Sequence, residues 1–139
     1  MDSTTITEEA ATVQDLDARQ WRLRRIDIRS PVLKDAWPVA RVELEHPERG
    51  RVTDIGTAPG AFDAAFVAAS HIVGVSPHLL SYNVRSGPPE EEGALPITIE
   101  VEIDHKGRTF SGSSSGVDLV RCSLEAWLDA IARSSGYTA

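Results

Sequence analysis

The stretch Gly56-Thr57-Ala58-Pro59-Gly60-Ala61-Phe62-Asp63-Ala64-Ala65-Phe66 has a counterpart later in the chain, Gly112-Ser113-Ser114-Ser115-Gly116-Val117-Asp118-Leu119-Val120. Both read Gly-x-x-x-Gly with an aspartate just inside an expected amphipathic helix. Gly60 and Gly116 are 56 residues apart, which predicts one supersecondary unit per copy and not one turn of a short-period solenoid. The chain is therefore interpreted as a duplicated half-domain.

Length, charge and cysteine content restrict the class of protein. The 139 residues are enough for one hydrophobic core, and a formal net charge of −7 argues against nucleic acid or anionic lipid as a partner. Cys122 is the single cysteine, so no intrachain disulfide is expected, and no segment approaches the roughly 18 apolar residues of a membrane span. These features predict a soluble protein of the cytoplasm.

The first unit is expected to begin after a flexible N-terminal lead at residues 1–20, which is acidic and Thr-rich without a sustained apolar period. Apolar residues then alternate over 21–28 and 39–44, and a short third strand over 52–55 is expected to end at Gly56. The following helix places one apolar stripe at Phe62, Phe66, Ala69 and Val73. This order predicts a βββα unit.

The second unit repeats the order. A strand over 79–84 and an acidic, Pro-rich loop over 87–93 precede the strictly alternating stretch 97–103, a turn at 105–108 and a third strand at 109–111. Ser115 is the expected N-cap of a helix with an apolar stripe at Val120, Leu124, Trp127, Leu128 and Ile131. The prediction is an α+β fold: one domain over 21–135 with a short tail at 136–139, in which two βββα units are related by a pseudo-twofold axis and antiparallel sheets pack on two helices.

The two glycine motifs, Trp21-x-Leu23, Leu80-x-Tyr82-x-Val84, and the run Asp118-Leu119-Val120 leading to Ser123 and Ala126 resemble the C-terminal regulatory domain of 2-isopropylmalate synthase and citramalate synthase. The resemblance covers nearly all of 21–135. It implies a homodimeric module that binds a branched-chain amino acid or related carboxylate at the dimer interface, beside the two glycine loops.

Glycines let backbone N–H groups approach a ligand, and a helix N-terminus adds positive potential for a carboxylate. With the resemblance, this predicts a ligand site made of Gly56, Ala58, Gly60, Ala61, Phe62, Asp63, Tyr82, Gly112, Ser114, Gly116 and Asp118. The competing interpretation is that the glycines only allow tight strand-to-helix turns, and that both aspartates only complement a helix dipole.

The chain also departs from the family pattern. Where the family commonly has Gly-x-Asp-Ala after the tyrosine, this chain has Gly87-Pro88-Pro89-Glu90-Glu91-Glu92-Gly93, so leucine is not assigned as its ligand. The synthases carry their chemistry on a separate barrel with a His-x-His metal site. His46, His71, His78 and His105 lack that spacing, so neither a complete synthase, a metal site nor a cofactor is expected. The same four are expected to be mostly solvated loop or helix-end residues.

Two function classes stay open at this point. The first is a stand-alone ligand-binding and dimerisation module, acting in trans on a synthase subunit or separated from one; Met1 and the flexible lead favour a natural start. The second is a small enzyme, of the isomerase or cyclase type and of specialised metabolism, in which Asp63, Asp118 and Tyr82 would be the acid and base. Trp21 and Trp127 are assigned to the core, and Cys122 is interpreted as a small buried residue.

Overall fold

Six strands and two helices make up the described part of the chain. The computed structural model describes residues 21–31, 35–86 and 96–134, so the predicted lead at 1–20, the acidic loop at 87–93 and the tail at 136–139 lie outside it. The elements are β1 (Arg22–Arg29), β2 (Val39–His46), β3 (Gly50–Thr57), α3 (Ala61–Val73), β4 (His78–Ser86), β5 (Ile97–His105), β6 (Arg108–Gly116) and α4 (Leu119–Ser134).

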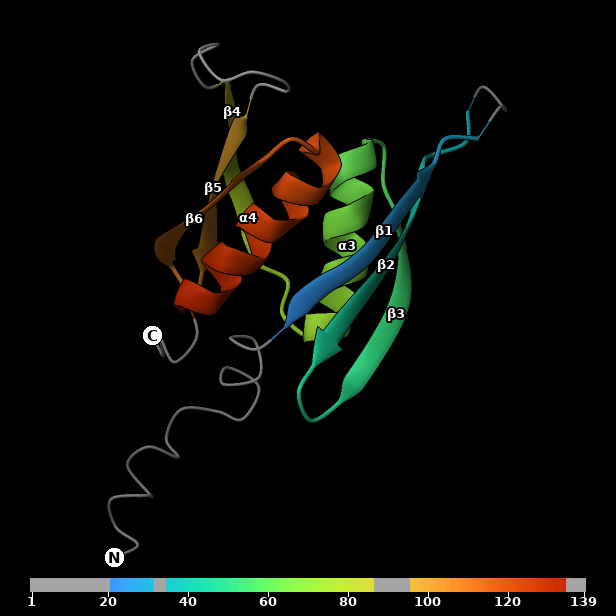
Figure 1. The fold of residues 1–139 in the computed structure, drawn as a ribbon, viewed down its shortest axis with the longest axis horizontal. Coiled ribbons are helices and arrows are strands. Elements are labelled where there is room, and N and C mark those ends of the chain that lie inside the picture. The colour runs from blue at the N-terminus through green and yellow to red at the C-terminus, as the bar shows by residue number, and fades with distance from the viewer. Residues whose placement is uncertain (1–20, 32–34, 87–95, 135–139) are drawn as a thin grey trace, which may run out of the picture.

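The strands form two separate three-stranded antiparallel sheets, in the orders β1-β2-β3 and β4-β5-β6. Each sheet is followed by its own helix, and the two helices lie side by side between the sheets (Figure 1). Both helices begin at the upper end of that view, so their N-termini share one end of the molecule. The predicted α+β fold with repeated βββα units is confirmed.

The two units match in their irregularities as well as in their order. The first strand of each sheet has a shift of register near its start, between Leu23 and Arg25 in β1 and between Leu79 and Ser81 in β4. Each such bulge leaves one extra residue outside the ladder. The shared position of the two bulges marks the units as two copies of one pattern.

The helix starts correct the alignment that the glycines suggested. Ala61 and Leu119 are 58 residues apart, two more than the spacing between Gly60 and Gly116. Gly116 therefore occupies the position of Ala58 in the first unit, and Asp118 that of Gly60. The expectation that Gly60 and Gly116 are equivalent is wrong, and the two copies of Gly-x-x-x-Gly are out of structural register.

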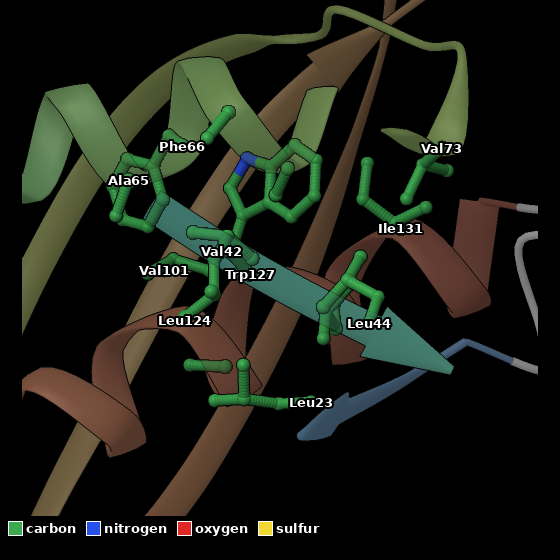
Figure 2. Packing of buried hydrophobic residues seen from close by; sticks show 14 of the residues in the cluster. Leu23, Val42, Leu44, Ala65, Phe66, Val73, Val101, Leu124, Trp127 and Ile131 are labelled. Atoms are coloured by element: carbon green, nitrogen blue, oxygen red, sulfur yellow. The ribbon is translucent and has the colours of Figure 1, made fainter. Parts of the chain in front are cut away.

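One core joins both units. The inward residues of the middle strands, Ala40, Val42 and Leu44 in β2 and Ile99, Val101 and Ile103 in β5, are all 0% exposed. Figure 2 shows how the helices meet them, with Phe66 of α3 beside Trp127 of α4. Those two rings are nearly parallel, with centroids 6.0 Å apart and planes at 14°. Trp21 and Trp127 are core residues, as predicted, at 6% and 2% exposure.

The predicted glycine loops are largely strand. Gly56 lies inside β3, and Gly112 to Gly116 form the second half of β6, paired along β5. A Cβ atom on Gly56 would lie 2.4 Å from the Ala64 carbonyl oxygen, and one on Gly112 would lie 2.3 Å from that of Ala126. These two glycines therefore let each helix pack directly on the backbone of its sheet.

Two local predictions also need correction. Helix α4 begins at Leu119, and Asp118 caps it by accepting a hydrogen bond from the Arg121 N–H at 3.1 Å, so Ser115 is not the N-cap. His46 is not a solvated loop residue: it ends β2, is 2% exposed, and its ring packs on Trp21 with centroids 5.0 Å apart.

Candidate functional site

The predicted site residues of the first unit line the start of α3. Ala58 is buried, Gly60 is the N-cap with φ −107° and ψ 149°, and Ala61, Phe62 and Asp63 form the first turn. No side chain caps this helix. Because its first N–H groups have no side-chain acceptor, the end of α3 carries donors and positive potential that an anion can use.

The residues of the second unit are more fully engaged. Ser114 Oγ donates to Glu125 Oε1 at 3.2 Å, and Asp118 accepts from the Arg121 N–H as described above. A Cβ atom on Gly116 would lie 3.0 Å from the sulfur of the buried Cys122. The described glycines with positive φ are Gly50, Gly74 and Gly107, so neither Gly60 nor Gly116 is required by a left-handed backbone.

Tyr82 connects the two helix starts. Its ring lies 5.8 Å, centroid to centroid, from that of Phe62 in the first turn of α3. Its hydroxyl is 2.5 Å from Ser123 Oγ, which itself donates to the Leu119 carbonyl oxygen at 2.8 Å in the first turn of α4. Since the single Ser123 hydroxyl proton is used there, the Tyr82 hydroxyl is the donor to Ser123. The structure thus brings Phe62, Tyr82 and Asp118-Leu119 to one end of the molecule.

Ser123 is the residue of this group to which sequence reasoning assigned no role. It is 1% exposed, one of three described polar residues in the buried class. A serine within the apolar stripe of α4 was the available signal, since a buried hydroxyl needs a hydrogen-bond partner.

An exposed apolar surface surrounds this end. Val84 on β4 is 47% exposed, and Val117 and Leu119 at the start of α4 are 66% and 37% exposed. Val84 pairs with Ile99, whose side chain is in the core, so it lies on the inner face of its sheet where that face runs past the helices. Large apolar side chains grouped in this way are typical of contact surfaces.

The hollows of the described surface divide the predicted site. Asp63 lines a groove of about 230 Å³ with Trp127, between α3 and the start of β4. Gly112 lines a separate hollow of about 520 Å³ on the outer face of the second sheet. Among the hollows that the structure describes, none is lined by the Ala58–Phe62 and Ser114–Asp118 segments together.

Two further observations concern the described residues alone. They hold no group of three or more histidine, cysteine or carboxylate side chains placed to bind a metal ion. Neither of their helices combines the length and the apolar character needed to cross a bilayer.

The fold and this end of it define a class: a duplicated βββα domain whose two helix N-termini are joined by one tyrosine. The chain belongs to the LeuA allosteric (dimerisation) domain family, whose model matches residues 6–135.

Its relatives include much longer proteins. A 2-isopropylmalate synthase of Methylacidiphilum infernorum is 32% identical over 94 residues, which are 68% of this chain and 18% of that protein. One from Crocosphaera subtropica is 30% identical over 99 residues, 71% of this chain and 18% of the relative. One from Rhodopirellula baltica is 29% identical over 121 residues, 87% of this chain and 22% of the relative. The chain thus spans about a fifth of the length of these synthases.

Proposed function

We propose that this protein is a dimeric regulatory module that binds a small amino acid or carboxylate at the end where its two helices begin. The observation that carries the proposal is the contact of Tyr82 with both helix starts, through Phe62 and through Ser123. Two helix N-termini at one end supply positive potential for a carboxylate. Membership of an allosteric domain family supports regulation as the role.

The ligand site is completed by a second copy of the chain. Val84, Val117 and Leu119 are exposed around the helix starts, and covering them would turn an open surface into an enclosed pocket. The dimerisation domain family supports a symmetric dimer. By analogy with the synthases, a cytoplasmic 2-isopropylmalate synthase or related enzyme is the subunit on which the dimer acts in trans.

A ligand screen by thermal shift tests the binding function. The probes are leucine, isoleucine, valine, their 2-oxo acids and 2-isopropylmalate. A ligand present at about a hundred times its dissociation constant raises the free energy of unfolding by about 2.7 kcal/mol. A series in which none of these compounds raises the unfolding temperature would contradict the proposed ligand class.

Gly60→Val then locates the site. Its added Cβ would approach only the side chain of Asp63, at 3.2 Å, and the extended backbone at Gly60 suits a branched residue, so the fold should persist. The new methyl groups cover the first N–H groups of α3 and should abolish binding. Thr109→Val, on an exposed strand position away from the helix starts, is the matched control. Equal affinity of Gly60→Val and the parent would move the site elsewhere.

Asp63→Asn and Asp118→Asn test the charges. Both keep the shape of the side chain, so a loss of affinity in a folded variant would assign an ammonium partner to that carboxylate. If both variants bind every ligand as the parent does, the two aspartates serve only to start their helices.

A further inference from the structure

The two units form two equivalent grooves, each between the helix of one unit and the first strand of the other. The groove between α4 and β1 is lined by Arg121, Leu128 and Asp129, among others. The groove between α3 and β4 is lined at the corresponding positions by Asp63, Ser70 and His71. The strand walls correspond as well, with Trp21 and Leu23 in one and Pro77 and Leu79 in the other.

The first groove contains a cation that the protein itself supplies. The guanidinium of Arg121 donates to the Leu23 carbonyl oxygen at 2.9 Å, next to the bulge of β1, and its Nε lies 3.3 Å from Glu125 Oε2. A bulge disrupts the hydrogen-bond ladder, so a donor from outside the sheet compensates for it. Arg121 thereby joins the helix of the second unit to the first strand of the first.

The second groove has the same shape of site with opposite charge. The position of Arg121 is taken by Asp63, and β4 has its own bulge directly after Leu79. No side chain in the described part of the chain donates to the Leu79 carbonyl oxygen, and Asp63 forms no ion pair or side-chain hydrogen bond there. The groove holds about 230 Å³, and its walls include the aromatic side chains of Phe66 and Trp127.

We propose that the groove between α3 and the start of β4 binds a small organic cation, a guanidinium or ammonium group on a short aliphatic chain. The cationic group lies between the Asp63 carboxylate and the Leu79 carbonyl oxygen, where the guanidinium of Arg121 lies in the sister groove. The aliphatic chain packs on Phe66, Leu79 and Trp127. This site takes a ligand of opposite charge to the carboxylate of the proposed regulatory site, and it needs no second copy of the chain.

Agmatine is the probe, because it carries a guanidinium and an ammonium group but no carboxylate. Calorimetric titration of the full chain should give saturable 1:1 binding with a dissociation constant below about 1 mM. Asp63→Asn should weaken the binding at least tenfold. Glu100→Gln, which removes a carboxylate from the outer face of the second sheet, should leave the affinity unchanged.

Asp63→Arg is the sharper variant, because it places the side chain of the sister groove in this one. It should abolish agmatine binding and raise the unfolding temperature, since the new guanidinium reaches the Leu79 carbonyl oxygen. Should this variant fail to fold, the comparison of Asp63→Asn with Glu100→Gln still decides.

Three results would overturn the proposal: no saturable binding of agmatine to the parent, equal affinity of Asp63→Asn, or binding of propionate with the same dependence on Asp63. A change of oligomeric state in Asp63→Asn without any agmatine binding would assign the groove to a protein contact instead. The carboxylate screen of the proposed function is unaffected by these outcomes.

Discussion

Gly112 is the residue with the least room for a side chain. Its Cβ would lie 2.3 Å from both the carbonyl oxygen of Ala126 and the amide nitrogen of Ala130, and helix backbone cannot turn aside as a side chain can. We therefore predict that Gly112→Ala lowers the free energy of unfolding by about 1–3 kcal/mol, the usual cost of overpacking. Denaturant unfolding followed by circular dichroism measures it.

Gly60→Ala is the matched control for Gly112→Ala. Its Cβ would meet only the Asp63 side chain, at 3.2 Å, which is free to rotate. The loss there should stay below about 0.5 kcal/mol, as for most surface substitutions. Equal losses in the two variants would mean that the close approach of α4 to β6 is not what Gly112 is for.

Asp118 gives a second prediction at this scale. As the N-cap of α4 it accepts the Arg121 N–H at 3.1 Å, so Asp118→Ala should cost about 0.5–2 kcal/mol of unfolding free energy. Asparagine keeps a carbonyl oxygen at the same place, so Asp118→Asn should cost less than half of that. Chemical denaturation compares the two, and equal losses would show that charge and not capping is the contribution of this residue.

Among the elements, the hairpin between β5 and β6 turns on two residues in the left-handed region, Lys106 at φ 55° and Gly107 at φ 83°. Such a turn favours Asn-Gly, because asparagine tolerates positive φ better than lysine does. Lys106→Asn should raise the free energy of unfolding by up to about 1 kcal/mol. Lys106→Gln, which is polar but has no such preference, should give no gain; if it stabilises the protein equally, the backbone is not the cause.

The sequence predicted those elements whose signal is local. Alternation over 97–103 identified β5, and the turn at 105–108 was predicted from its glycine and polar residues. The stretch 112–116 was misread as a loop, because glycine and serine have low strand propensity and their pairing with β5 is a tertiary effect. The glycines marked close packing under the helices, a purpose that a motif for turns does not distinguish.

The candidate site shows the same division. Tyr82, Phe62 and the helix starts were predicted and do lie together at one end of the molecule. Ser123 was missed as the link, because its hydrogen bonds join elements distant in sequence. The equivalence of Arg121 and Asp63 could not be found from the motifs, since aligning the glycines shifts the second unit by two residues.

At the scale of the whole molecule, the duplication is a frame in which the two halves have diverged. Equivalent bulges and grooves remain, while one groove is closed by Arg121 and its partner is left with Asp63. The second sheet also leaves Val84 exposed on its inner face. An isolated chain with one core and such a surface gains stability by covering it with a second copy.

The last prediction concerns that dimer. Light scattering on a sizing column should give the mass of two chains at micromolar concentration. The double variant Val117→Glu/Leu119→Glu should give a monomer, because it puts charge into the surface around the helix starts. Glutamate at the start of α4 also complements the helix dipole, so the folded monomer should not be weakened. Ile55→Glu is the control: it is 55% exposed on the outer face of the first sheet, opposite Arg41. If Ile55→Glu dissociates the dimer and the double variant does not, the interface lies on the outer sheet face, away from the helix starts, and the ligand pocket cannot be completed by a second copy.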